Sequence, residues 1–286
     1  MRRDSSRVAE GTLLLITAIW GTTFPLLSVI LHRVDAYTIV AVRFSIAALV
    51  LCLIYRRRLA RMGRQDLWDG IRTGLFLVGG YLTQAIGLTT ISVPRSAFLT
   101  GTAVVFMPFI AFLVQRSRVR LGEILGVALV FVGLLIFYAD AGLSLHAGDL
   151  WTLAGAVFFA CQVVYTNVAA RRSDPFAVSA MQALVSGAMG WIFVAARGKL
   201  SVPTEAWGTL LYLGVIATAL ILVLQTWALG KTKPVRAGVI YSLEPVFASL
   251  FAMGFFGAHM SGWEVLGSAA ILSGVLVAEL KKVSAD

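Results

Sequence analysis

Two ionisable side chains lie deep inside long apolar stretches of the sequence, Arg43 and Glu244. Each costs roughly 2.5 to 3.5 kcal/mol at the centre of a membrane helix, so function is the default interpretation for such residues. A guanidinium and a carboxylate together match the two charges of a zwitterion. Their depths in the stretches differ by roughly 10 Å, which argues against a direct ion pair and allows them to bracket a ligand. Snorkelling by Arg43 and helix fastening by Glu244 remain open alternatives.

Aromatic and polar side chains recur at helical spacing in the same apolar stretches. Four pairs share a helix face: Trp20 with Thr23, Tyr81 with Gln84, Gln162 with Tyr165, and Tyr241 with Glu244. Such pairs line a cavity or form hydrogen bonds between helices worth roughly 0.6 kcal/mol each, and spacing alone leaves both alternatives open. Of the seven tryptophans, only Trp20 stands near the middle of a stretch, so it is the best aromatic candidate for substrate contact, with core packing as the alternative.

Three prolines fall inside the apolar stretches: Pro25, Pro108 and Pro245. Proline lacks the backbone N–H and so frees the carbonyl four residues earlier. Interrupted helices near the middle of the bilayer form the binding sites of many transporters, although a single proline often makes only a kink. We predict helix breaks at these three prolines, beside the site.

The apolar stretches are the elements that must position these residues. Hydrophobic residues make up 59% of the 286-residue chain and charged residues only 13%, which excludes an ordinary soluble domain. A membrane-spanning helix needs roughly 20 mostly apolar residues. We predict an all-α integral membrane protein, residues 1–286 forming a single membrane domain. Ten transmembrane helices are expected at residues 11–31, 36–55, 71–90, 96–115, 121–139, 150–170, 176–195, 207–229, 237–256 and 262–280.

Positive charge alternates from one connection to the next. Eighteen of the 24 Lys and Arg residues fall before the first stretch, after the last, or in alternate connections, and four fall in the remaining connections. Because cytoplasmic connections carry the excess of Lys and Arg, both termini are predicted to be cytoplasmic, with the protein in the cell (inner) membrane. This distribution accounts for the net charge of +10, so we expect no nucleic-acid partner.

The chain matches itself at an offset of about 140 residues. Glu123, Leu125, Gly126, Ala128 and Gly133 align without gaps on Glu264, Leu266, Gly267, Ala269 and Gly274. Asp35 aligns with Asp174, Gly74 with Gly214 at an offset one larger, and Gln84 with Gln225 and Arg95 with Arg236 at an offset two larger. We predict two five-helix repeats, residues 1–140 and 148–286. Five is odd, so the repeats are inverted, which is typical of transporters that work by alternating access.

Several short motifs occur together in a telling order: Trp20-Gly21, Arg43-Phe44, Arg95-Ser96-Ala97-Phe98-Leu99-Thr100-Gly101 leading to Pro108, and Glu244-Pro245-Val246. In this order they resemble the drug/metabolite transporter superfamily of EamA type, over essentially the whole chain. Within it the chain is most similar to the YddG amino-acid exporters. The resemblance implies ten helices, two inverted repeats and export of amino acids.

The few charged residues deep in the apolar stretches limit the class of substrate. One deep arginine is too few for a phosphate or nucleotide-sugar carrier, and one deep carboxylate is too few for a carrier of multivalent cations. The three histidines, His32, His146 and His259, fall in connections without a cluster of metal ligands or catalytic partners. We therefore predict no catalytic residue, no metal site, no cofactor and no enzymatic activity, and small zwitterions or neutral amphiphiles remain as substrates.

We predict a secondary transporter that exports amino acids or related small metabolites across the cytoplasmic membrane. An exporter of amphiphilic drugs, a lipid flippase and, less readily, a membrane-embedded enzyme stay open as alternatives, and a monomer is compatible with the sequence. The expected substrate-binding residues are Trp20, Arg43, Tyr81, Gln84, Gln162, Tyr165 and Tyr241. Glu244 is the candidate for coupling export to proton entry, because a buried carboxyl group can exchange protons.

Overall fold

The computed structural model describes residues 2–91, 93–116, 120–139, 146–197 and 200–280, and these ranges contain helices and no strand. The longest helices are α1 (Arg2–Ile30), α2 (Ala36–Leu59), α3 (Arg64–Gly87), α6 (Leu121–Phe137), α7 (Ala147–Ala169), α8 (Pro175–Arg197) and α13 (Gly262–Leu280). Three further segments are interrupted: α4 (Val93–Gly101) with α5 (Ala103–Gln115); η2 (Thr204–Ala206), α9 (Trp207–Leu211), η3 (Tyr212–Leu220) and α10 (Ile221–Leu229); and α11 (Pro234–Tyr241) with α12 (Glu244–Phe256).

Local signals in the sequence explain where several helices begin. The carboxylate of Asp35 accepts a hydrogen bond from the backbone N–H of Tyr37 at the start of α2. Asp174 caps α8 in the same way, accepting from the backbone N–H of Phe176. Aspartate is among the preferred residues at this position, because it satisfies backbone donors that have no partner within the helix.

Seven helical segments in the described part of the chain are long and apolar enough to cross a membrane. They are Ser5–Leu27, Ala36–Leu59, Arg95–Gln115, Ala147–Ala169, Pro175–Arg197, Thr204–Leu229 and Pro234–Phe255. Leu121–Phe137 and Gly262–Ala278 are apolar but shorter. The all-helical, multi-span architecture is therefore confirmed, while the count of ten spans stays a prediction.

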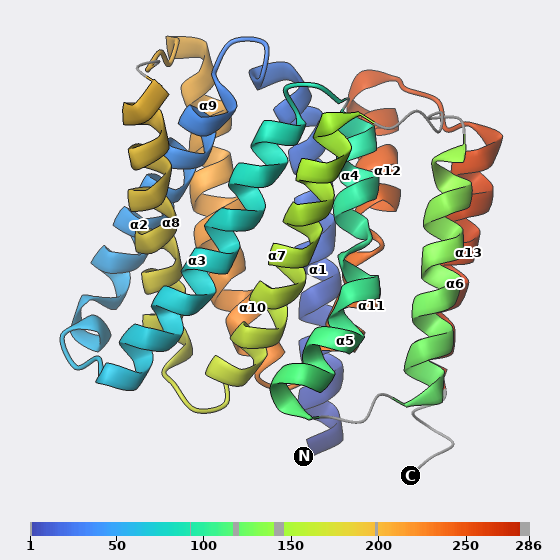
Figure 1. Ribbon diagram of the computed structural model, residues 1–286, viewed down its shortest axis with the longest axis horizontal. Coiled ribbons are helices and arrows are strands. Elements are labelled where there is room, and N and C mark those ends of the chain that lie inside the picture. Colours follow the sequence, from blue (N-terminus) through green and yellow to red (C-terminus); the bar gives the residue numbers. More distant parts are fainter. Residues whose placement is uncertain (1, 92, 117–119, 140–145, 198–199, 281–286) are drawn as a thin grey trace.

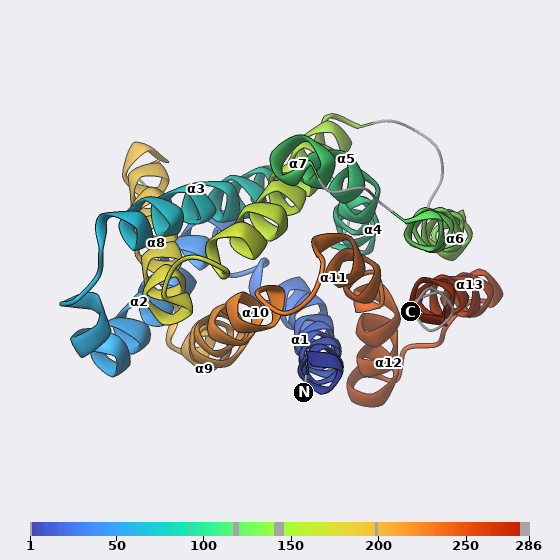
Figure 2. The same ribbon diagram turned by 90° about the horizontal axis from the view of Figure 1, so that it is seen from below.

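The helices form two layers when the molecule is seen from below (Figure 2). One layer holds α3, α7, α4 and α5, and the other holds α9, α10, α1, α11 and α12. The paired helices α2 and α8 close the layers at one side, and α6 with α13 stand at the other. Figure 1 shows that α1 begins and α13 ends at the same end of the bundle, drawn as its lower end.

Helices α6 and α13 approach closely because glycine lies on both sides of their contact. A Cβ atom on Gly126 would lie 3.0 Å from the carbonyl oxygen of Gly274, and one on Gly267 would collide with the backbone of Phe137. Small residues at helix crossings let backbones pack tightly in membranes, where lipid removes most of the hydrophobic drive for association. The aligned glycines of the two halves thus share one interface.

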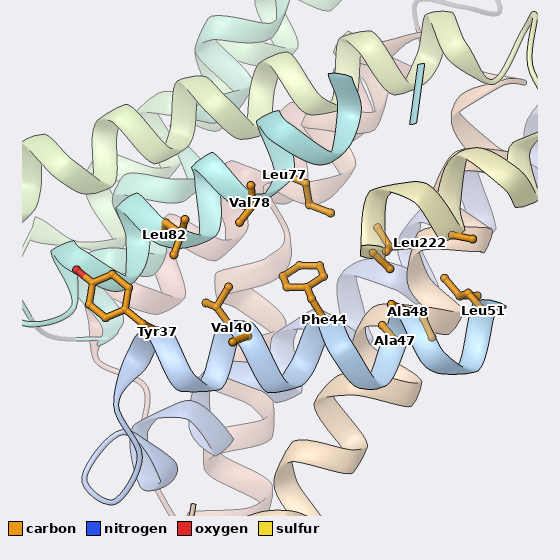
Figure 3. Close-up of a cluster of buried hydrophobic side chains, with 14 of the residues drawn as sticks. Tyr37, Val40, Phe44, Ala47, Ala48, Leu51, Leu77, Val78, Leu82 and Leu222 are labelled. Carbon is orange, nitrogen blue, oxygen red and sulfur yellow. The ribbon is translucent and has the colours of Figure 1, made fainter. Parts of the chain in front are cut away.

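The face of α2 beside Arg43 is held by a cluster of apolar side chains. Figure 3 shows Val40 and Phe44 of α2 pointing toward α3, where Leu77 and Val78 meet them. Phe44 is fully buried, and its ring meets the edge of the Tyr81 ring at 5.1 Å between centroids. This packing fixes the rotation of α2 and therefore the direction in which the neighbouring Arg43 points.

Helix breaks are expected at three prolines, and the structure has one at only one of them, Pro245. Helix α1 continues through Pro25 and α5 continues through Pro108, so the prediction of an interruption at these two residues is wrong. A proline removes one backbone hydrogen bond, and membrane helices tolerate that loss where neighbouring groups satisfy the freed carbonyl. Pro245 does follow a break, in the first turn of α12. The corresponding break in the first half lies at Thr102, six residues before Pro108.

Candidate functional site

A cavity of about 110 Å³ lies between the two layers of helices. Seven of the eight residues proposed for binding or coupling line it: Trp20, Arg43, Tyr81, Gln84, Gln162, Tyr241 and Glu244. They come from six helices, α1, α2, α3, α7, α11 and α12. The volume is enough for several water molecules, since one needs roughly 10 to 15 Å³ of such space. The structure thus gathers the proposed polar groups at one place, and their binding role stays a prediction.

The guanidinium group of Arg43 is held by two hydrogen bonds along its edge and by an aromatic ring against its face. Its Nε donates to the hydroxyl of Thr218 at 2.5 Å, and its Nη2 donates to the carbonyl of Ala217 at 2.9 Å. The guanidinium also lies over the ring of Tyr81, 4.8 Å from its centroid. Only 3% of Arg43 is exposed. A cation in this setting does not snorkel to the membrane surface, so that alternative is excluded for the described conformation.

Glu244 stands in the same cavity at the start of α12. It is partly buried, and within the described ranges no Lys, Arg or His nitrogen lies within 4 Å of its carboxylate. Arg43 and Glu244 therefore share a cavity without forming an ion pair. The cavity thus presents a guanidinium and a carboxyl group that are not bonded to each other.

Trp20 and Tyr241 form an aromatic wall beside Glu244. Their ring centroids lie 5.2 Å apart with planes at 58°. The indole Nε1 of Trp20 and the hydroxyl of Tyr241 are buried and have no hydrogen-bond partner among the described residues. Buried polar atoms in native proteins usually have a partner, so these two are candidates for hydrogen bonds to a ligand or to water.

A cluster of glutamines closes the cavity toward α8. The amide nitrogen of Gln162 donates to Gln182 Oε1 at 2.9 Å and lies 3.2 Å from Gln225 Oε1. Gln84 donates to the hydroxyl of Thr100 at 2.8 Å. Sequence reasoning proposed Gln84 and Gln162 but missed Gln182 and Gln225. The alignment of Gln84 with Gln225 is the signal that could have found the latter.

Tyr165 lies apart from the cavity. Its ring stacks on Phe76 of α3, with centroids 5.0 Å apart and planes at 24°. Residues three apart on a helix differ by about 60° in direction, since an α-helix has 3.6 residues per turn. With Gln162 turned inward, Tyr165 faces α3 instead.

The cavity continues toward the upper end of the bundle. A second, smaller space shares Leu27, Arg43, Tyr81 and Gln84 with it and extends to Leu31 and Leu88. These last two residues follow α1 and α3 at the end opposite the chain termini (Figure 1).

Hydrogen bonds cross between the layers at the lower end. The side-chain amide of Asn167 donates to the carbonyl of Thr232 at 2.8 Å and to that of Leu229, and it accepts from Gln115. Asn167 is fully buried. This amide therefore joins α7 to the end of α10 and to the segment that follows it.

The described residues offer no group of three or more His, Cys, Asp or Glu side chains placed to hold a metal ion. What the cavity provides instead is a fixed guanidinium, a carboxylate without a cation partner, and two buried hydrogen-bonding atoms. These groups are complementary to a small polar molecule, and their binding role stays a prediction.

Comparison with known proteins agrees with this picture. The sequence profile of the EamA-like transporter family matches residues 8–139 and 146–280. A protein of Archaeoglobus fulgidus described as an uncharacterized transporter is 31% identical over 96% of this chain and 86% of its own length. A probable amino-acid metabolite efflux pump of Salmonella typhimurium is 22% identical over 92% of both chains. The biotin transporter of Escherichia coli is 25% identical over 80% of this chain and 77% of its own.

A crystal structure with 20% sequence identity superimposes with a TM-score of 0.80 and covers 97% of both chains, which shows the same fold. The family match spans both halves of the sequence, and the relatives are transporters by name. The chain is therefore a multi-pass membrane transporter, not an enzyme, and belongs to the EamA-like transporter family.

Proposed function

We propose that this protein is a secondary transporter that exports amino acids or closely related small zwitterions. One observation carries the proposal: Arg43 and Glu244 share one cavity in the middle of the bundle without pairing with each other. A carboxylate ligand near Arg43 and an ammonium group near Glu244 would give each buried charge a partner. The name of the Salmonella typhimurium relative supports the same substrate class.

The proposed mechanism is alternating access by two inverted five-helix repeats, residues 1–140 and 148–286. Two ion pairs support the repeats. Near the upper end Arg95 Nε lies 2.6 Å from Asp149 Oδ1, linking α4 to α7. Near the lower end the aligned Arg236 Nη1 lies 3.8 Å from Glu10 Oε1, linking α11 to α1. The same connection thus occurs at opposite ends of the bundle, as inversion requires.

Alternating access needs an end that opens and an end that closes. In the described conformation the cavity extends toward Leu31 and Leu88, while Asn167 joins the layers below it. With cytoplasmic termini, this arrangement is an outward-facing state. Export then requires a second state in which the bonds of Asn167 to Leu229 and Thr232 break and the upper ends meet.

The proposed location is the cytoplasmic membrane, with ten spans and both termini inside. Topology reporters should read cytoplasmic after Lys282 and in the Arg56 to Arg64 connection, and external near Ser144. Lys282 and Ser144 lie outside the described residues. A C-terminal reporter that reads external would contradict two five-helix halves of opposite orientation.

Counterflow in proteoliposomes tests the substrate class. Liposomes with purified protein are loaded with one unlabelled compound, and uptake of its labelled form is followed for L-amino acids, biotin, amphiphilic drugs and a fluorescent phospholipid. The proposal predicts counterflow of one or more amino acids. Counterflow of drugs alone, or phospholipid scrambling without amino-acid movement, would overturn it in favour of a drug exporter or a flippase.

A further inference from the structure

The segment from Trp207 to Leu229 changes its helical winding inside the bundle. Helix α9 ends at Leu211, the nine residues Tyr212–Leu220 form the π-helix η3, and α-helical winding resumes in α10. π-Helices hold well under 1% of residues in soluble proteins and are frequent at functional sites. A π segment of this length indicates a local structural reason.

The two halves of the chain show what that reason is. Gly74 and Gln84 are ten residues apart in α3, whereas the matching Gly214 and Gln225 are eleven residues apart. The second half therefore carries one extra residue in this interval. A π turn accommodates an added residue within a continuous helix, because its hydrogen bonds join residues five apart rather than four. Most of η3 lies in the interval that contains the addition.

The π-helical segment holds both groups that anchor Arg43. Ala217 offers its carbonyl to Nη2 of Arg43, and Thr218 offers its hydroxyl to Nε. The hydroxyl of Thr218 in turn donates to the carbonyl of Leu213, five residues earlier, at 2.7 Å. One hydroxyl thus supports the π winding and accepts from the guanidinium. These bonds use Nε and Nη2, two of the nitrogens of the guanidinium, and so fix the orientation of its plane.

No equivalent pair can form in the other half. The position that matches Arg43 is Gln182, counted from the aligned caps Asp35 and Asp174. The positions that match Thr218 are Leu77 or Val78, which have no hydrogen-bonding side chain. Arg43 and the threonine that anchors it therefore meet at one contact between the two halves of the chain, and neither is present at the matching position of the opposite half.

We propose that η3 is part of the substrate site and that Thr218 is the positioning residue that aims Arg43 at a substrate carboxylate. The inference rests on the proposed function and adds a specificity determinant to it. Since Thr218 acts through the guanidinium, its removal should weaken binding of ligands that have a carboxylate. Ligands without a carboxylate should not sense the change.

The test compares L-leucine with 3-methylbutylamine, which is leucine without its carboxylate, as competitors in amino-acid counterflow. Thr218→Val keeps the side-chain volume and removes the hydroxyl. We expect it to weaken competition by L-leucine about tenfold and competition by the amine less than twofold. Thr218→Ser, which keeps the hydroxyl, should restore wild-type competition. The matched control is Thr73→Val, another buried threonine whose hydroxyl bonds the carbonyl of Asp69 and lies outside the cavity.

A second measurement decides the inference without any substrate. The Nε–H signal of Arg43, followed by ¹⁵N NMR of the purified protein, should shift and exchange faster with water in Thr218→Val than in Thr73→Val. An unchanged signal overturns the anchor. In the transport assay, equal losses for L-leucine and the amine, or no loss for either, overturn it as well. Wild-type protein that moves no amino acid overturns the proposed function instead, and the NMR signal alone then decides whether Thr218 positions Arg43.

Discussion

The two halves of the molecule agree at their helix ends and differ at the cavity. Asp35 and Asp174 cap α2 and α8 with the same bond to the backbone N–H two residues later. Eight residues beyond these caps, α2 carries Arg43 and α8 carries Gln182. The shared caps preserve the scaffold, while the buried charge is present in one half only.

The interrupted helices also share an arginine in their first turn and differ at the cavity, but here the second half carries the ionisable side chain. Arg95 and Arg236 begin corresponding segments, and each lies near a carboxylate of the helix beside it. Eight residues further on, the first half has Ala103 and the second half has Glu244. Each half thus contributes one charge of opposite sign. Under the proposed alternating access, two related halves suit two exchangeable conformations, and a cavity with one charge from each half suits a ligand that binds in one orientation.

The largest effect on transport is expected when Arg43 of α2 is replaced by glutamine, the residue at the matching position 182 of α8. Arg43→Gln should lower kcat/KM for amino-acid counterflow at least about 100-fold, because a desolvated carboxylate of the ligand would lose the one cation among the described residues that line the cavity. Arg43→Lys should also weaken transport, since lysine lacks the planar guanidinium that Thr218 and Ala217 hold. Unchanged amino-acid affinity in Arg43→Gln protein would remove Arg43 from the site.

Removal of the Glu244 carboxylate should affect transport driven by a pH gradient much more than counterflow. We expect Glu244→Gln to lose transport driven by a pH gradient by more than about tenfold, because the amide does not exchange protons. Counterflow should persist with a KM raised a few fold, since the amide oxygen still accepts a hydrogen bond from an ammonium group. Full gradient-driven transport by well-folded Glu244→Gln protein would end the coupling hypothesis, and equal losses in both modes would indicate a structural role.

The glutamine cluster should matter more for stability in one half than in the other. Gln162→Leu removes the donor shared by two buried carbonyl oxygens, those of Gln182 and Gln225, and should lower the free energy of unfolding by about 1–3 kcal/mol. Gln84→Leu breaks a single bond to Thr100 beside the open part of the cavity and should cost less. Thermal unfolding in detergent measures both variants, and equal destabilisation would contradict the difference drawn between the halves.

The smallest effect concerns the shared helix caps. Burial raises the pKa of the Asp174 carboxyl, but hydrogen bonds from Arg58 and from the backbone N–H groups of Phe176 and Ala177 outweigh it and hold the pKa below its ordinary value. A lowered pKa in the folded state means stabilisation that is present above the ordinary Asp pKa and is lost as pH falls through the folded value.

Asp174→Asn should therefore destabilise the protein by at most about 1 kcal/mol near neutral pH. The difference from wild type should shrink as the pH falls below about 4, the ordinary aspartate pKa. Asp35→Asn should cost less, because its carboxylate accepts a bond from Tyr37 but, among the described residues, has no arginine partner like Arg58. A gap between wild type and Asp174→Asn that widens on acidification would contradict this account.

Much of the fold follows from one-dimensional signals. Apolar length predicts spanning helices, and the aligned glycines and arginines predict two related halves whose equivalent residues lie at equivalent contacts. Arg43 and Glu244 could be found because ionisable residues deep in apolar stretches are rare and costly. Their meeting in one cavity depends on helix packing, which the helix spacing alone does not specify.

The failures have physical reasons. Tyr165 shares a broad face with Gln162, but a rotation of about 60° separates a cavity from a helix interface. Pro25 and Pro108 remove a backbone bond without ending a helix, so proline alone does not locate a break. The anchor of Arg43 includes a backbone carbonyl, that of Ala217, which no side-chain motif can reveal. The one sequence signal for this anchor is the extra residue between Gly214 and Gln225, compared with the matching interval of the first half.

The central claim is that the cavity binds one zwitterion by both of its charges, in one orientation. Competition in counterflow by L-leucine, by 3-methylbutylamine, which lacks the carboxylate, and by 4-methylpentanoic acid, which lacks the ammonium group, tests it most directly in the wild-type protein. Each analogue that lacks one charge should compete at least about tenfold more weakly than L-leucine, since one buried charge of the site would stay without a partner. If either analogue competes as well as L-leucine, Arg43 and Glu244 do not read the two ends of one ligand.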